Sequence, residues 1–179
     1  MSFSFYKASP EYCDFLRTSD PCVPYTKDGK ETRPFVGIVF SINGFNYFAP
    51  LSSPKPKHRK MKNQIDFLKI AGGEYGAINF NNMIPIHPSC LQPVDIAFCD
   101  DDSKETLNYK NLLANQLSWC NKSENAEFIL HKAKSLYYSI KTKTARHELV
   151  SRCCDFAIDE SQYLIYCKAH GFPVSTEEE

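Results

Sequence analysis

Two hydroxyl groups and a dense run of positive charge follow one another in the stretch PLSSPKPKHRKMK. Ser52 and Ser53 come directly after a run of apolar and aromatic residues, and Lys55 follows them closely. Hydroxyl and ammonium groups donate hydrogen bonds to phosphate oxygens, and Pro54 and Pro56 restrict the backbone between them. The pattern therefore predicts a stiff loop that holds Ser53 and Lys55 in a defined geometry beside a phosphate.

Five further polar residues extend the positive charge of this loop: Lys57, His58, Arg59, Lys60 and Lys62. Such a run is suited to the backbone of a nucleic acid. The plainer interpretation is a solvated loop that keeps a hydrophobic sheet soluble. A surface histidine in basic surroundings tends to be neutral at pH 7, so His58 is predicted to contact RNA rather than to act as the main proton-transfer group.

Composition indicates a single globular domain over residues 1–179. The chain is 42% hydrophobic, and its 21 basic and 21 acidic residues cancel. Any attraction for a polyanion must therefore come from segregated charge. Acidic residues gather at 100–102 and 177–179, whereas residues 55–62 carry no acid at all.

The eight cysteines contain no C-x-x-C pair, and the chain shows neither a secretory signal nor a long apolar span. We expect a protein of the reducing cytoplasm, without a membrane segment, whose cysteines are buried structural residues. His87 with Cys90, and Cys153 with Cys154, lack the paired spacing of a zinc site, so no metal or other cofactor is expected. No cysteine lies in a recognisable nucleophile context, which argues against a cysteine hydrolase.

The first half of the chain has the pattern of an antiparallel sheet. A strand and a helix capped by Ser9 begin the chain, and Asn43-Gly44 is predicted to form the turn of a hairpin between residues 34–42 and 45–51. Further strands are expected within residues 75–86 and in VDIAF, at 94–98.

Helical patterns fill the rest of the chain. A helix is expected from Ile65 to Ile70, after the basic loop, and another after a capping box at Asp102. Helices are also expected from Ser123 onward, after about residue 144, and in a last segment that ends at Gly171. The predicted class is α+β, a strongly curved antiparallel sheet surrounded by helices.

Aromatic residues are frequent enough to supply both a core and a binding surface. Most are expected to be buried, as strand aromatics usually are. Tyr12, at the start of a helix, and Tyr25, in a loop, are the better candidates for exposed rings on which unpaired bases stack.

The stretches FVGIVFSINGFNYFAPLSSPKPKH and GAINFNNMIPI together resemble the ToxN/AbiQ/CptN family of type III toxin–antitoxin endoribonucleases, and FYKASPEYCDFL resembles the family's amino-terminal stretch. The similarity is good over about residues 3–90 and looser in the helical half. The resemblance implies a curved sheet with surrounding helices, similar to MazF/Kid toxins.

The resemblance also implies site residues. The family's hydroxyl pair falls on Ser52 and Ser53 and its active-site lysine on Lys55, while Tyr12 matches the amino-terminal tyrosine and Arg33 the basic residue before the first long strand. Tyr25 is placed at a family loop tyrosine, and Asn79, in the motif I-N-x-x-x-M-I-P-I, is assigned to RNA binding.

The activity that the resemblance implies is metal-independent cleavage of RNA by attack of a ribose 2′-hydroxyl, which leaves a 2′,3′-cyclic phosphate and a 5′-hydroxyl end. The implied substrates are cellular or phage RNA. The implied partner is a repeated, folded RNA antitoxin, expected to be a pseudoknot, which the toxin processes. Toxin and antitoxin RNA are expected to form a closed complex. Lys55, Tyr12 and His58 all remain candidates for the acid and the base. The alternative is a non-catalytic module that binds single-stranded RNA.

Overall fold

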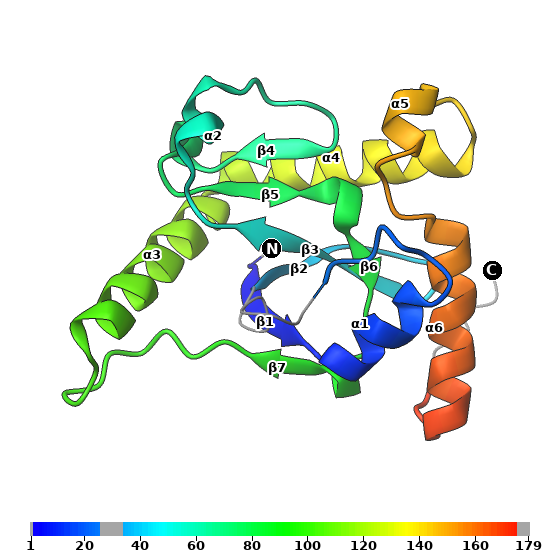
Figure 1. The fold of residues 1–179 in the computed structure, drawn as a ribbon, viewed down its shortest axis with the longest axis horizontal. Helices are drawn as coiled ribbons and strands as arrows, with labels where there is room; N and C mark the ends of the chain where they lie inside the picture. Colours follow the sequence, from blue (N-terminus) through cyan, green and yellow to red (C-terminus); the bar gives the residue numbers. More distant parts are fainter. Residues whose placement is uncertain (1, 26–33, 175–179) are drawn as a thin grey trace.

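The computed structural model describes residues 2–25 and 34–174 (Figure 1). Its seven strands are β1 (Ser4–Ala8), β2 (Phe35–Ile42), β3 (Phe45–Ser52), β4 (Phe67–Lys69), β5 (Ala77–Asn79), β6 (Ile84–Pro85) and β7 (Leu91–Pro93). Its α-helices are α1 (Pro10–Arg17), α2 (Pro56–Lys60), α3 (Lys104–Cys120), α4 (Ser123–Lys141), α5 (His147–Val150) and α6 (Phe156–His170). Three short 3₁₀ turns, η1 (Ala71–Gly73), η2 (Phe80–Asn82) and η3 (Pro88–Cys90), join the small strands.

All the strand pairs are antiparallel and form one curved sheet in the order β4-β5-β3-β2-β1-β7, with β6 paired to β3. The predicted hairpin is confirmed: Ile42 pairs with Phe45, and Asn43 and Gly44 have φ angles of 49° and 77°. Positive φ at both central residues is the requirement of a type I′ turn, which Asn-Gly meets at little cost. The hairpin fixes the place of β3 beside β2, and the serine pair lies at the end of β3.

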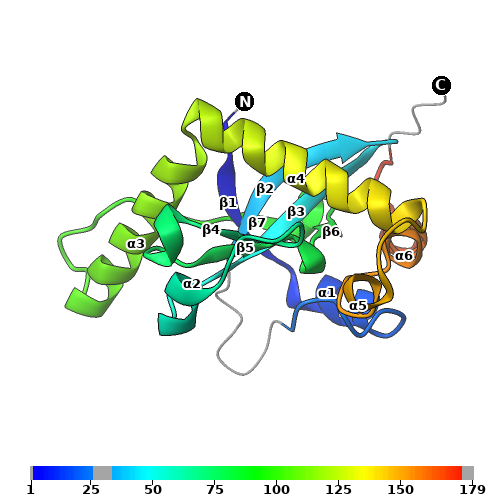
Figure 2. The same ribbon diagram turned by 90° about the horizontal axis from the view of Figure 1, so that it is seen from above.

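Helices cover the sheet, and the predicted α+β class is confirmed. Figure 2 shows α4 running across the sheet beside β2 and β3, and α6 lying at one end next to α1. The two sides of this core are joined by Glu160 of α6, whose Oε1 accepts hydrogen bonds from Tyr47 of β3 and Tyr137 of α4 at 2.8 and 2.7 Å. The second half of the chain therefore supports the strands of the first half.

Local signals at the ends of two helices are confirmed. Ser9 Oγ accepts from the Tyr12 backbone amide at 3.3 Å at the start of α1, and α6 ends at Gly171, whose φ is 67°. The cap of α3 lies one residue later than expected, because Ser103, not Asp102, accepts from the Thr106 amide. Asp102 instead accepts from the Cys99 amide and pairs with Lys110.

Two other expectations are wrong. Residues 65–70 do not form a helix: their apolar run is β4, which pairs with β5, and the helix in this region is α2, within the basic run. A short apolar run fits a strand or a helix equally well, and Pro56 at the first helical position favours a helix start. The strand expected in VDIAF lies earlier, as β7, which pairs with β1.

The interior contains several ionisable groups. All eight cysteines are free thiols, and six of them are buried. Asp159 is fully buried, and burial together with the nearby Asp20 raises its pKa to about 8. Within residues 2–25 and 34–174, no helix has the length and apolarity needed to cross a membrane.

Candidate RNA-cleaving site

The serine pair lies at the end of β3, where the sheet holds one hydroxyl and leaves the other free to solvent. Ser52 pairs with Ala77 of β5, and its Oγ accepts a hydrogen bond from Asn79 Nδ2 at 2.6 Å. Ser53 is exposed. A Cβ atom at Gly76, whose φ is +96°, would meet the Ser52 carbonyl oxygen at 2.0 Å, so only glycine allows β5 to begin this close to the pair.

Lys55 follows as the last extended residue before α2. Its φ and ψ are −135° and 146°, and its carbonyl oxygen accepts from the His58 amide at 2.9 Å in the first turn of α2. Pro54 and Pro56 flank it and fix the chain direction on both sides. The predicted stiff connection is therefore present, and the exposed Lys55 side chain is held two residues beyond Ser53.

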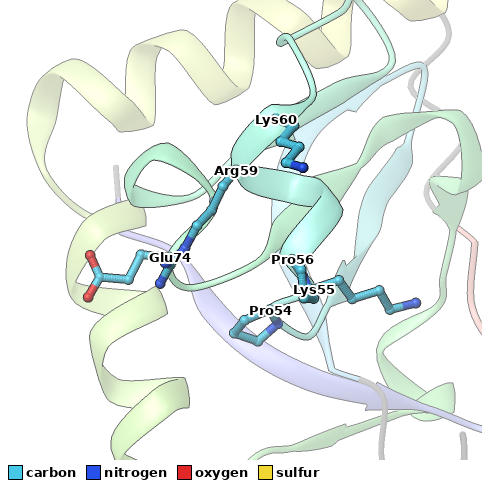
Figure 3. Close-up of a pocket in the computed structure, with 7 residues that line it drawn as sticks. Pro54, Lys55, Pro56, Arg59, Lys60 and Glu74 are labelled. Carbon is cyan, nitrogen blue, oxygen red and sulfur yellow. The ribbon is translucent and has the colours of Figure 1, made fainter.

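The side chains of α2 and of the residues on either side of it form a positive surface, which we call the basic surface: Lys55, Lys57, Arg59, Lys60 and Lys62. All five are exposed. Figure 3 shows Lys55, Arg59 and Lys60 projecting from α2 and its start in different directions, so the charge covers an area rather than a point. Such a surface suits several phosphates of one RNA backbone.

A pocket of about 410 Å³ lies beside this surface and is lined by Pro54, Lys55, Pro56, Arg59, Lys60, Gly73 and Glu74. A Cβ atom at Gly73 would meet the His58 carbonyl carbon at 2.8 Å, so the glycine allows η1 to pack against α2. Sequence reasoning missed Glu74, because its place at the pocket depends on this packing. The only local signal was the run GGEYG, with three glycines at positive φ.

The structure corrects the expectation for His58. Its side chain is 3% exposed and packs edge-on against the Phe67 ring, with 5.7 Å between ring centroids. Burial lowers the pKa of His58, and the nearby Lys55 and Lys57 lower it further. His58 therefore lies beneath the basic surface, and its side chain does not reach RNA from this position.

Tyr12 is also corrected, from an exposed ring to a core residue. Its side chain is 0% exposed, its hydroxyl donates to the Pro85 carbonyl oxygen at 2.6 Å, and its ring packs edge-on against Tyr166. Burial raises the pKa of Tyr12 well above its usual value. Tyr12 lies near the start of α1, on the face of this helix that α6 covers, and the packing of α6 buries its side chain.

The remaining two predicted positions are Tyr25 and Arg33. Tyr25 is 39% exposed, and the Arg17 guanidinium lies over its ring at 4.9 Å. This agrees with the expected exposure and provides a ring that Arg17 orients. Arg33 lies outside the described residues.

Comparison with known proteins gives a consistent result. A family model described as Toxin ToxN, type III toxin–antitoxin system, matches residues 4–164. The endoribonuclease ToxN of Bacillus thuringiensis subsp. kurstaki is 31% identical over 156 residues, which span 85% of this chain and 78% of that protein. The endoribonuclease AbiQ of Lactococcus lactis subsp. lactis is 29% identical over 186 residues, which span 96% and 93%.

The fold is similar to solved toxin structures. One, from work on selective toxin inhibition by a non-coding RNA pseudoknot, has a TM-score of 0.74 at 30% identity and covers 93% of this chain and 98% of that one. Fold, site and relatives define a class of bacterial toxins that are endoribonucleases. The chain belongs to the ToxN family of type III toxin–antitoxin systems.

Proposed function

We propose that this endoribonuclease toxin cuts RNA without a metal ion, at the end of β3, and leaves a 2′,3′-cyclic phosphate and a 5′-hydroxyl end. The observation that carries the proposal is the arrangement of Ser52, Ser53 and Lys55. One hydroxyl is anchored to Asn79, the next is exposed, and an exposed ammonium group follows between two prolines.

The reaction needs in-line attack and stabilisation of charge at phosphorus. The ribose 2′-oxygen gives its proton to solvent water and bonds to the adjacent phosphorus. The bond from phosphorus to the 5′-oxygen breaks as that oxygen gains a proton. The phosphorane formed on the way carries extra negative charge, which preorganised donors stabilise. Ser53 Oγ and Lys55 Nζ are the donors assigned to this task.

Lys55 is also the proposed source of the proton for the leaving oxygen. Of the three groups that the sequence offers for proton transfer, Tyr12 and His58 are buried and Lys55 is exposed beside the serines. Ser52 is assigned a positioning role, because its hydroxyl already accepts from Asn79. This hydrogen bond sets the direction in which β3 presents Ser53.

The proposed partner is a repeated, folded RNA antitoxin that the toxin processes and that then inhibits it. One similar structure comes from work on toxin inhibition by a non-coding RNA pseudoknot, and another from work on a processed non-coding RNA that regulates a bacterial antiviral system. Substrate and antitoxin present the same phosphate chemistry, so both are assigned to the basic surface, with Tyr25 as a stacking ring. Arg33 is assigned to the catalytic group. We propose that several toxin and RNA copies close into one complex in the cytoplasm, and that phage or cellular RNA is the target.

The alternative expected from the sequence, an RNA-binding module without catalysis, agrees less well with these observations. Binding alone requires the basic surface but not an anchored hydroxyl pair. The named relatives are endoribonucleases.

A cleavage assay tests the proposal. The full chain, freed of its antitoxin, is incubated with total RNA in buffer with EDTA, and new ends are analysed for 5′-hydroxyl and cyclic phosphate groups. Ser53→Ala and Lys55→Ala should each slow cleavage by on the order of a hundredfold or more, which is typical of losing one transition-state donor. Both changes should alter the free energy of unfolding by within about 0.5 kcal/mol, because the sites are exposed.

The matched control is Lys104→Ala, which removes an exposed lysine at the start of α3. It should cleave at the wild-type rate. Wild-type rates in both site variants would refute the assignment, and binding without any new ends in the wild-type protein would support the non-catalytic module.

A further inference from the structure

Three buried side chains that RNA cleavage does not use lie together near α1 and α6. Asp20 follows α1, Cys154 precedes α6, and Asp159 lies in the first turn of α6. One carboxylate oxygen from each aspartate and the sulfur of Cys154 all lie within 4.8 Å of one another. The fold thus brings three side chains of types that can bind a metal ion to one place in the interior, although Asp20 is far in the sequence from the other two.

Asp159 provides a second and independent observation. Its side chain is 0% exposed, and neither carboxylate oxygen has a hydrogen-bond partner among the described residues. Buried polar groups are nearly always paired, so an unpaired carboxylate requires an explanation. Asp20 differs: its two oxygens accept from the Cys22 and Asp155 amides at 2.8 and 2.7 Å, which orients its carboxylate.

The donor set and its spacing match a small divalent cation. Thiolate and carboxylate ligands both bind zinc, at bond lengths of about 2.0–2.3 Å, so neighbouring ligand atoms of a tetrahedral site lie about 3.3–3.8 Å apart. The three donor atoms lie within 4.8 Å of one another, an upper limit above that spacing, so binding of the ion draws them closer together. The second oxygen of Asp159 also lacks a partner among the described residues, and it allows this carboxylate to bind the ion through both oxygens.

We propose that Asp20, Cys154 and Asp159 bind one zinc ion that joins the segment after α1 to the start of α6. The site is structural and separate from RNA cleavage, because α2, beside the serine pair, and α6 lie on different sides of the molecule in both views (Figures 1 and 2). The paired cysteine and histidine spacing of a zinc motif is absent from the sequence, and ligands that only the tertiary fold brings together leave no such pattern.

Metal analysis of the full chain tests the proposal. The protein is purified without chelators or a metal-affinity tag, incubated with zinc chloride, desalted and analysed by mass spectrometry of the elements. About one zinc per chain is expected for the wild type, and loss of the metal for Cys154→Ala and Asp159→Asn. The matched control, Cys120→Ala, removes a buried cysteine outside the cluster and should retain zinc.

Two measurements on the wild type keep the test decisive if a variant fails to fold. Cobalt(II) in place of zinc should give a thiolate-to-metal charge-transfer absorption, and zinc should raise the midpoint of thermal unfolding relative to protein stripped by a chelator. Absence of bound zinc, of the cobalt band and of the thermal shift overturns the proposal. Full metal content in the folded Cys154→Ala variant overturns it as well.

Discussion

At the residue scale, Tyr12 lies inside the core, where its side chain is fully buried. Its hydroxyl donates to the buried carbonyl of Pro85, so Tyr12→Phe leaves that carbonyl without its partner. We expect a loss of about 1–3 kcal/mol in the free energy of unfolding, measured by urea titration. We expect no change in the cleavage rate below the unfolding transition. A large fall in rate with unchanged stability would return Tyr12 to the catalytic group.

His58 should make stability depend on pH. Its folded-state pKa is lowered by burial and by Lys55 and Lys57, so the unfolded chain binds its proton more readily. The stability that His58 contributes to the folded chain is therefore complete above about pH 6.5, the pKa of an ordinary histidine. This contribution decreases as the pH falls below that value.

The measurement compares the free energy of unfolding of the wild type and His58→Phe from pH 8 to pH 5. As the pH falls, the free energy of unfolding of the wild type should decrease relative to that of His58→Phe. A constant difference would show that the folded and unfolded chains bind the His58 proton equally.

The closeness of Ser52, Ser53 and Lys55 in space was predictable because they lie within four residues of the sequence. Exposure was harder to predict. His58 and Tyr12 are buried by Phe67 and Tyr166, which are distant in the sequence. Glu74 reaches the pocket only because η1 packs against α2.

At the scale of the element, α2 carries the positive charge as a short helix between the serine pair and β4. Lys57→Ala, Arg59→Ala and Lys60→Ala together should weaken antitoxin binding and flatten its salt dependence. The expected decrease is roughly 0.7–0.9 of a log–log slope unit for each phosphate that the variant no longer neutralises. Cleavage should fall less than in Lys55→Ala.

Binding of antitoxin RNA measured over a range of salt concentrations checks this prediction. A matched control removes three lysines elsewhere on the helices, Lys104→Ala, Lys122→Ala and Lys134→Ala. Equal slopes for the wild type and the α2 triple variant would mean that α2 is a solvated helix with no contact to RNA.

Elements with local signals were predictable, and those that depend on pairing were not. Asn43-Gly44, the Ser9 cap and the Gly171 end each act through neighbouring backbone, and all three are present. Strand β4 has three residues and exists because it pairs with β5. Its sequence alone fits a helix as well, and the structure resolves the ambiguity through that pairing.

At the scale of the whole molecule, the cysteines serve the core. Burial raises the pKa of Cys13, Cys120 and Cys153 to about 12, so these thiols are unreactive at neutral pH. Treatment of the folded protein with iodoacetamide should modify the exposed Cys99 and leave RNA cleavage intact.

Peptide mass analysis after alkylation, with a denatured sample as the control for complete labelling, checks the cysteine prediction. Cys99→Ser should behave as the wild type in cleavage. Inhibition that follows modification of one cysteine in a still folded chain would indicate a thiol in the chemistry.

The bond between Ser52 and Asn79 also bears on how the toxin is made. The anchor of Ser52 is on β5, a strand synthesised later, and β3 itself packs through Tyr47 against Phe156 and Glu160 of α6, which is synthesised later still. A growing chain on the ribosome first lacks Asn79, which anchors Ser52, and then lacks α6, which packs against β3. Because domains fold as units, the site is not held in place until α6 is present. Cutting activity is therefore expected to begin only after α6 has been synthesised and has packed against the sheet.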